Sequence, residues 1–552
     1  MAEEQSKILP AEPVLDPHKE YEEINGYVVF WGLFFAAIFS LAVGYLCLKI
    51  GQTVDAFAPV SILSMGMAII FHCKNAFAET VHIQAIASSG TSSLCGSMFI
   101  LPALYILNIQ GVSAFEMIVP ILLGGVLGVF FSVMFRRYFC EEMHYVYPYP
   151  SGRAAAEVLL SSEGSKAKLM IASGLIGMAY DFVLNTLGWW QEVISTTTFS
   201  WGQAIQSKFK LAMSLDSDAA LLGIGYFTGL RYAAIIAAGS FFSWFIAIPI
   251  VYYMGGDFPM VVKGQGILLA DAPVRAVFLG YVRHVGISSL AYTGNEPVSG
   301  MTIFMILVAG VILSAIGMGG QTGMIAVLMM AAFLATCIGV AGNFMAELKV
   351  AYLTGATPAK MQKWQAVGCV LSAVVSVGVL VLLNSAYGFV GEGALNAPQA
   401  NAMAAIVEPL MSGGDAPWPL YMAGAFFAIV LWMVKVPPLA FALGAYLPME
   451  INMPVLVGGL INYLVSTSSD DEDTNRLRMS KGGTIASGLV AGGAIGSLIS
   501  AILRIAGVDW FLGEWVETPG ATYLGMVMYI FLCGYMYKFS MKVKAKKVVA
   551  KA

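Results

Sequence analysis

The chain is poor in charge for its length. Only 11% of its 552 residues are Asp, Glu, Lys or Arg, against roughly 25% in soluble globular proteins, while 58% are hydrophobic. The mean hydropathy is +0.78. This composition excludes an ordinary water-soluble fold and indicates that the solvent of most side chains is the lipid bilayer. A formal net charge of −4 gives no reason to expect a nucleic-acid partner.

Cysteine and histidine are scarce as well. The seven cysteines lie singly, mostly inside apolar runs, and the five histidines show no metal-ligand spacing. We therefore expect no metal and no cofactor. The sequence has no Walker A, H-E-x-x-H or G-x-S-x-G motif, so we predict neither direct ATP hydrolysis nor an enzyme. An intramembrane enzyme remains the less favoured alternative.

Long apolar segments recur along the whole chain. A helix needs about 20 mostly apolar residues to cross a bilayer. Segments of that kind are 26–50, 55–71, 117–134, 169–187, 301–318, 324–340, 364–383, 453–465, 482–503 and 523–537. Residues 80–107, 219–254 and 421–447 carry Gly, Pro or polar residues inside apolar runs, which predicts broken helices or pairs of short spans. We expect an all-α polytopic membrane protein with about 14–16 transmembrane helices.

The basic residues indicate the orientation in the membrane. Lysine and arginine are in excess on the cytoplasmic side, and the C-terminal region holds Lys538, Lys542, Lys544, Lys546, Lys547 and Lys551. We therefore expect a cytoplasmic C-terminus in the cell inner (cytoplasmic) membrane. An even number of spans would place the N-terminus on the same side.

The two halves of the chain show weak internal similarity. Gly51-Gln52-Thr53 follows the first long span, and Gly320-Gln321-Thr322 follows the span that opens the second half. We divide the chain into a cytoplasmic N-terminal segment 1–25, a first transmembrane repeat 26–290, a second repeat 291–540 and a basic tail 541–552. Such repeats are typical of secondary transporters. The polar stretches 191–218, 384–418 and 466–481 are predicted to be loops.

A first group of polar residues lies inside an apolar run at 79–84. A helix here places Glu79 and His82 one turn apart, with Gln84 beyond them and a small polar stretch at 88–93 that could unwind. Unsatisfied polar groups are expensive in lipid, so such residues usually face a cavity or a partner. Glu79, His82 and Gln84 are therefore candidates for ligand or proton binding. The alternative is that Glu79 and His82 cap the cytoplasmic end of a span in water.

A second group follows two prolines at 148 and 150. Tyr149, Ser151, Arg153 and Glu157 surround the start of a helix too short to span. Ser151 is a natural N-cap, and the helix N-terminus would offer free N–H groups to an anion such as a peptide carboxylate. The alternative is an interfacial turn and helix that only joins two spans.

A third group begins at Gly342. Asn343, Glu347 and Lys349 lead to a Thr-Gly-Ala-Thr-Pro turn at 354–358. Glu347 and Lys349 could form an ion pair and relay protons. Because they lie close to the cytoplasmic boundary, a structural role is the alternative.

At these three places the chain resembles the oligopeptide transporter family, in particular its prokaryotic members, which are related to the yellow-stripe-like branch. Glu79 with Gln84 is similar to the family element Glu-Asn-x-x-x-Gln, and residues 149–152 resemble Tyr-Pro-Ser/Glu-Gly-Thr-Ala. Residues 342–354 resemble Gly-Asp-x-x-Gln-Asp-x-Lys-x-Gly-Tyr-Leu, while 396–400 and 447–448 match prokaryotic signatures. These elements follow the family order over nearly the whole chain.

The chain also departs from the family pattern. Thr80 replaces Asn, Arg153 replaces Thr and Asn343 replaces Asp. The missing carboxylate at Asn343 argues against a proton-relay role for that position. Arg153 and His82 suggest an altered ligand.

The resemblance implies proton-driven uptake of small oligopeptides across the cytoplasmic membrane by a duplicated helical bundle. The implied partners are a peptide or peptide-like chelate, protons and the lipid bilayer, and a homo-oligomer is left open. A carrier of metal chelates, of the siderophore or nicotianamine kind, is the alternative. A carboxylate such as Glu79 or Glu347 is predicted to take up the proton, and Glu79→Gln is expected to abolish coupled uptake.

Overall fold

The computed structural model describes residues 15, 21–50, 60, 61, 64, 75–143, 149, 156, 159, 164–255, 259–262, 265–283, 285, 300–390, 394, 395, 397–412, 418–508 and 510–543. Within these residues the regular secondary structure is helical apart from two short hairpins. Ten of the described helical segments are long and apolar enough to cross a membrane. The predicted all-α polytopic fold is confirmed. The total of 14–16 spans stays a prediction, because most of the expected span 55–71 lies outside the described residues.

Contacts divide the chain into two compact units, and each unit combines a segment from the first half of the chain with one from the second half. Unit 1 comprises Met1–Lys168 and Gly294–Ala416, and unit 2 comprises Leu169–Thr293 and Pro417–Ala552. Each unit thus takes one segment from each predicted repeat. The division into repeats 26–290 and 291–540 therefore stays a prediction about sequence duplication, separate from these spatial units.

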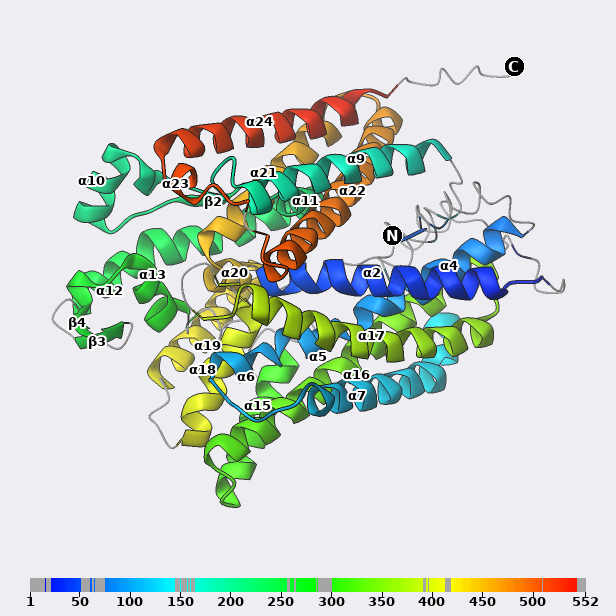
Figure 1. The fold of residues 1–552 in the computed structure, drawn as a ribbon, viewed down its shortest axis with the longest axis horizontal. Helices are drawn as coiled ribbons and strands as arrows, with labels where there is room; N and C mark the ends of the chain where they lie inside the picture. The colour runs from blue at the N-terminus through cyan, green and yellow to red at the C-terminus, as the bar shows by residue number, and fades with distance from the viewer. Residues whose placement is uncertain are drawn as a thin grey trace. The chain divides into compact units, whose positions relative to one another are not determined.

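Unit 1 is a bundle in which α4 packs against α2, α16 and α17, while α7 packs against α16 and α17 (Figure 1). Its described helices are α2 (Gly26–Ile50), α4 (Ala76–Ser92), α5 (Leu94–Phe99), α6 (Pro102–Ile106), α7 (Ala114–Arg136), the π-helical turn η1 (Arg137–Glu142), α15 (Gly300–Ala315), α16 (Gly320–Thr354), α17 (Pro358–Ala386) and α18 (Pro398–Ser412).

The predicted interruption of residues 80–107 is confirmed. The segment forms three consecutive helices, α4, α5 and α6, and Pro102 lies in the first turn of the last one. Proline suits that position because its missing N–H would have no helical partner there. From Ala78 to Ser92 every residue of α4 is buried, polar residues included. The most polar membrane segment of unit 1 is thus also its most enclosed.

A glycine allows α4 to approach α2 closely. A Cβ atom at Gly90 would overlap the backbone carbonyl and Cα of Ala36. Small residues at such crossings let membrane helices pack backbone to backbone. Gly90 therefore fixes the separation of the two helices.

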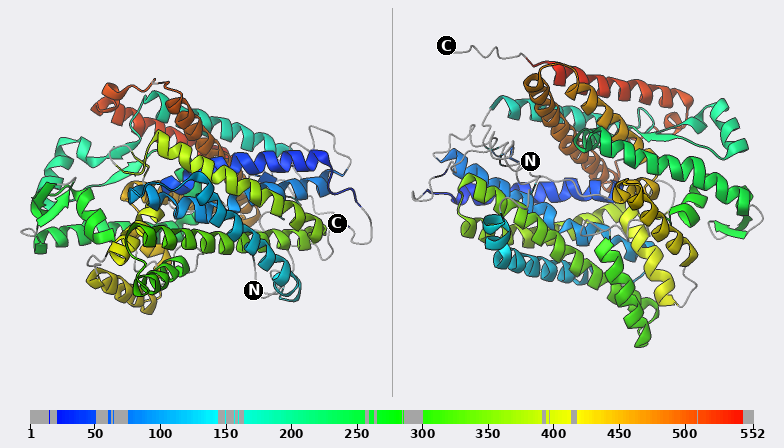
Figure 2. Two further views of the ribbon diagram at one scale, coloured as in Figure 1. Left: turned by 60° about the horizontal axis from the view of Figure 1, so that its bottom comes forward. Right: turned by 180° about the vertical axis from the view of Figure 1, so that it is seen from behind.

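Unit 2 contains the other long helices, two antiparallel hairpins and several π-helical turns, and Figure 2 gives two further views of the chain. Its described elements are α9 (Gly164–Phe182), η2 (Val183–Leu187), β1 (Val193–Ser195), η3 (Thr196–Thr198), α10 (Ser200–Phe209), β2 (Ser214–Asp216), α11 (Ala219–Phe241), η4 (Phe242–Ala247), α12 (Ile248–Gly255), β3 (Pro259–Val262), β4 (Gln265–Leu268), η5 (Leu269–Asp271), α13 (Val274–Val277), η6 (Phe278–Val282), α19 (Trp418–Met433), α20 (Pro438–Tyr446), α21 (Met449–Ser466), α22 (Glu472–Ile505), α23 (Gly513–Val516) and α24 (Pro519–Met541).

The other two predicted interruptions are confirmed as well. Helix α11 has a non-helical residue at Gly229, with φ 72° and ψ 159°, and passes into the π-helical turn η4 at Phe242. Helix α19 ends at Met433, and α20 begins at Pro438. Positive φ at Gly229 costs little because glycine has no Cβ.

The predicted loops were partly wrong. Residues 384–418 contain helix α18, which begins at Pro398, and proline is favoured in a first helical turn. Residues 466–481 become helical at Glu472, because the Asp471 side chain caps α22 by accepting from the Thr474 amide at 3.1 Å. Residues 191–218 form the β1–β2 hairpin around α10, with Val193 opposite Asp216.

Large apolar side chains are exposed on the outer helices. Phe130 and Val126 on α7, and Ile530 and Phe531 on α24, are all more than half exposed. In water such patches would be unfavourable. In a multi-pass protein they contact lipid tails.

Candidate functional site

A buried carboxylate in unit 1 lies between two membrane-spanning helices. Glu347 on α16 has 1% of its surface exposed. Its Oε1 accepts a hydrogen bond from Gln84 Nε2 at 2.7 Å and another from Ser88 Oγ, both on α4. Two donors thus converge on one carboxylate oxygen inside the bundle.

Helical spacing extends this contact into a longer stripe. Gln84, Ser88 and Ser92 recur every four residues and so share one face of α4, while Asn343 and Glu347 share one face of α16. Asn343 Nδ2 donates to Ser92 Oγ over 3.5 Å. We call these five residues the α4–α16 polar seam. It offers a carboxyl group, two amides and two hydroxyls within the membrane-spanning part of the chain.

Another face of α4 is held by serines. Ser372 on α17 and Ser40 on α2 both donate to the Gly90 carbonyl at 2.5 Å, and Ser372 also contacts Ser93. These bonds join three helices at a point where the backbone of α4 is about to break. Their role is to hold the helices together.

Glu79 and His82 lie near the start of α4, and both are buried. Glu79 is in the first turn, and its Oε1 accepts from Asn25 Nδ2 at 3.2 Å. His82 Nε2 lies 3.2 Å from Glu23 Oε2, and its Nδ1 lies 2.9 Å from the Ala78 carbonyl. The interpretation that they cap a helix end in water does not fit this burial.

Lys349 is buried on α16, two residues beyond Glu347. Residues two apart on a helix point to roughly opposite sides, and Lys349 Nζ donates to the Cys140 carbonyl at 3.2 Å. The same Nζ lies 5.9 Å from the ring centre of Tyr149 and 5.3 Å from that of Tyr352. The structure therefore gives Lys349 and Glu347 different neighbours instead of the expected ion pair.

Only one residue of the second predicted group is described. Tyr149 has a φ of 41°, which is uncommon for a side chain of its size. The other three candidates of that group, Ser151, Arg153 and Glu157, lie outside the described residues.

Several residues of the site have no sequence signal of their own. Ser88 and Ser92 belong to a run of small polar residues from which no single member stands out, and Glu23 precedes the first span. Glu347 and Gln84 are 263 positions apart. In the sequence, only the four-residue spacing of Gln84, Ser88 and Ser92 indicates that these residues share one face of a helix. Among the described residues no group of three or more His, Cys, Asp or Glu side chains could hold a metal ion.

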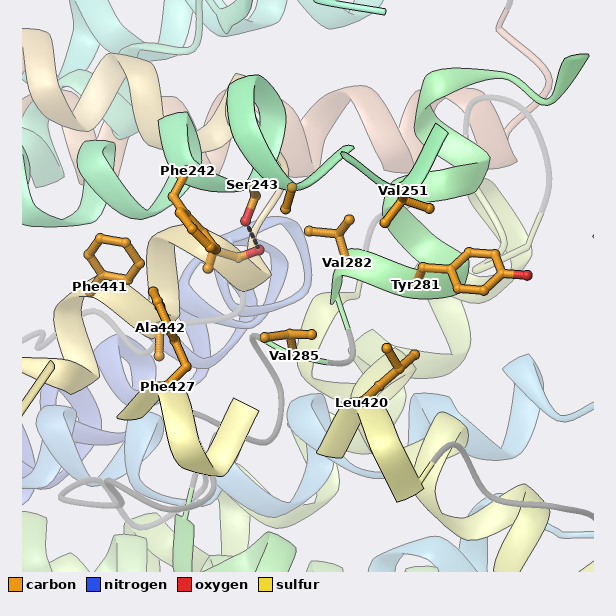
Figure 3. A pocket seen from close by; sticks show the side chains of 12 residues that line it. Phe242, Ser243, Val251, Tyr281, Val282, Val285, Leu420, Phe427, Phe441 and Ala442 are labelled. Atoms are coloured by element: carbon orange, nitrogen blue, oxygen red, sulfur yellow. Dashed lines mark hydrogen bonds between the residues drawn. The ribbon is translucent and has the colours of Figure 1, made fainter. Parts of the chain in front are cut away.

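Unit 2 contains an apolar cavity of about 150 Å³. The rings of Phe242, Phe427 and Phe441 pack together at one end, with centroids 4.8–5.8 Å apart, and the hydroxyl of Tyr281 points away from the cavity (Figure 3). Ser243 Oγ, in its wall, donates to the Ala445 carbonyl at 3.0 Å. The cavity suits a hydrocarbon group and offers no charge that could fix the ends of a peptide.

Fold and site together define a class. Ten described helices able to span a membrane, interrupted helices and a polar seam in their interior make this a multi-pass integral membrane protein. The family described as OPT oligopeptide transporter protein matches residues 23–288 and 276–504. The chain therefore belongs to the OPT oligopeptide transporter family, which confirms the resemblance drawn from its motifs.

One similar protein comes from Haemophilus influenzae and carries the provisional name of an oligopeptide transporter. It is 23% identical over 653 residues, an alignment that covers 91% of this chain and 100% of the relative. The similarity thus extends over nearly the full length of both proteins. Family and relative both point to a transporter.

Proposed function

We propose that this chain is a secondary active transporter that takes up small oligopeptides across the cytoplasmic membrane together with protons. Membership of the OPT family and the name of the Haemophilus relative support the transport of oligopeptides. The absence of a Walker A motif from the sequence favours an ion gradient as the energy source. The basic C-terminal region supports a cytoplasmic C-terminus.

The observation that carries the proposal is the burial of Glu347 beside Gln84 and Ser88. A charged carboxylate inside a membrane-spanning helix is costly unless donors or a proton compensate it. The ionised group accepts the two hydrogen bonds that the structure shows. Protonation makes the group a donor and leaves it fewer lone pairs, so proton binding changes what the seam can offer to a ligand.

Of the two buried carboxylates Glu79 and Glu347, we assign the transported proton to Glu347. Glu79 lies in the first turn of α4, where the helix dipole stabilises a negative charge. Glu347 lies within α16, about two turns before its C-terminal end at Thr354, where the helix dipole gives a negative charge no such support. Compared with Glu79, the protonation state of Glu347 therefore depends more on the hydrogen bonds from Gln84 and Ser88.

The remaining seam residues match the chemistry of a peptide backbone. Gln84 and Asn343 offer amides, and Ser88 and Ser92 offer hydroxyls, which can pair with N–H and C=O groups. Ser151 and Arg153 remain candidates for the peptide carboxylate. In this arrangement a peptide would replace contacts that the helices now make with each other.

Uptake into proteoliposomes under an imposed pH gradient tests the proposal. A mixed pool of di- to hexapeptides is compared with the same pool supplied as iron or nickel chelates. Accumulation of free peptides that collapses with a protonophore is the expected result. Accumulation of chelates alone would move the protein to the metal-chelate alternative, and accumulation of neither would overturn the proposal.

A further inference from the structure

Glu23 fastens the segment before the first membrane helix to the start of α17. Its carboxylate is 5% exposed and accepts hydrogen bonds from the Thr357 amide at 3.0 Å, from Thr357 Oγ1 at 2.6 Å and from Lys360 Nζ at 3.2 Å. Thr357 is the N-cap of α17. The stretch 21–25 is thereby tied to a helix more than 330 residues further along the chain.

His82 on α4 completes this cluster, with an oxygen beside each of its ring nitrogens. The side chain is fully buried. Nδ1 lies 2.9 Å from the Ala78 carbonyl, and Nε2 lies 3.2 Å from Glu23 Oε2 without being in line for a hydrogen bond. Both oxygens are acceptors, since a carbonyl and an ionised carboxylate have no proton to donate.

Neither neutral form of His82 satisfies this arrangement. If Nδ1 carries the proton, the lone pair of Nε2 faces the carboxylate of Glu23. If Nε2 carries it, the lone pair of Nδ1 faces the Ala78 carbonyl. Both contacts become favourable only when the pair formed by His82 and Glu23 binds one additional proton, beyond those of a neutral histidine and an ionised glutamate.

The charges around the pair indicate where that proton lies. Burial acts to raise the pKa of Glu23, but the hydrogen bonds from Thr357, aided by His82 and Lys360, bring the pKa below its ordinary value. Glu23 therefore keeps its negative charge, so the additional proton taken up by the pair binds to His82. Burial of the imidazole opposes its positive charge most strongly, and Lys360 on α17 opposes it as well, whereas the Ala78 carbonyl and the Glu23 carboxylate favour it. Glu79 on α4 is occupied by Asn25.

We propose that Glu23, His82, Thr357 and Lys360 form a proton-binding latch that holds residues 21–25 against α4 and α17. While His82 is protonated, Glu23 is bound from both helices. When His82 loses its proton, the attraction between its positive charge and the carboxylate is lost and one ring nitrogen faces an oxygen with a lone pair, so the segment is held mainly from α17. Histidine suits this task because its charge changes near physiological pH. The inference rests on these contacts and is independent of the proposed function.

Hydrogen exchange of the full chain in detergent micelles tests the latch. Peptides that cover residues 21–30 and 355–360 are followed by mass spectrometry at about pH 5.5 and about pH 8, either side of the ordinary histidine pKa. After correction for the intrinsic pH dependence of exchange, wild-type protection in both peptides should fall about tenfold from the lower to the higher pH, because the close contact between the two charges is lost. His82→Gln should show low protection at both pH values.

Thr357→Ala is the matched control. It removes one hydroxyl hydrogen bond to Glu23 and leaves His82 intact, so protection should fall by the same factor at both pH values. Equal wild-type protection at the two pH values would overturn the latch, and so would an unchanged pH dependence in His82→Gln. If that variant fails to fold, the wild-type comparison alone still decides, because it needs no substitution. Uptake is not part of this readout.

Discussion

Gln84 Nε2 donates to Glu347 Oε1 over 2.7 Å, although the two residues are 263 positions apart in the sequence. The bond crosses between α4 and α16, and Ser88 donates to the same oxygen. It places the carboxyl group of Glu347 against the most enclosed helix of unit 1. The proposed proton coupling depends on this relationship.

Glu347→Gln should abolish proton-driven accumulation. The amide keeps a carbonyl oxygen for Gln84 and Ser88, so the helix contacts should survive, but it cannot take up a proton. Uptake into proteoliposomes should then reach only about the external concentration, as in simple equilibration. The measurement is steady-state peptide accumulation under an inward proton gradient.

Glu472→Gln serves as the control for Glu347→Gln. Glu472 is an exposed residue at the start of α22, outside the seam. Accumulation should match that of the wild type. Wild-type accumulation by Glu347→Gln would remove this residue from the coupling mechanism.

Glu79→Gln distinguishes the two carboxylates. From its place in the first turn of α4, Glu79 should contribute about 0.3–1 kcal/mol through the helix dipole, and the substitution should lower thermal stability slightly while leaving accumulation intact. The sequence alone left Glu79 and Glu347 as candidates for the proton and predicted that Glu79→Gln would abolish coupled uptake. Loss of accumulation in Glu79→Gln but not in Glu347→Gln would restore that assignment.

Gly90→Ala should destabilise the fold. The added methyl group meets the backbone of Ala36, which cannot move without shifting α2, and overpacking of this kind typically costs about 1–3 kcal/mol. Gly378→Ala is the matched control, since a Cβ there meets nothing within 4 Å. In the middle of α17 that change should stabilise by about 0.5–1 kcal/mol. Thermal unfolding in detergent measures both, and a stabilising Gly90→Ala would contradict the close approach.

Acid should reduce the contribution that the Glu23 carboxylate makes to the stability of the fold. Because its pKa in the folded protein is below the ordinary value, the group stabilises the fold at pH values above about 4.3, the value of an unperturbed glutamate. This contribution is lost as the pH falls through the lowered folded pKa. The difference in Tm between wild type and Glu23→Gln should therefore shrink between about pH 5 and about pH 3. A difference that stays constant would show that the charge of Glu23 does not stabilise the fold.

The sequence predicted much of the helical framework because hydropathy is a local property. The long helices α2, α7, α16, α17 and α24 coincide with apolar runs, and the breaks in 80–107, 219–254 and 421–447 lie where Gly, Pro and polar residues interrupt them. Helix α18 was missed because its polar, alanine-rich segment lacks an apolar run. The proline at its start, Pro398, is the one local signal in the sequence that favours a helix beginning there.

The sequence by itself determined that this chain spans a membrane, that several of its helices are interrupted and that it belongs among the oligopeptide transporters. It also pointed to Glu79, His82, Gln84 and Glu347. Only the tertiary structure decided that Glu347 faces Gln84 and Ser88, that Lys349 turns toward Cys140, and that His82 meets Glu23. The reason is physical: the run of residues fixes how a segment meets lipid, whereas the partner of a buried polar group is set by helices that pack together from distant parts of the chain.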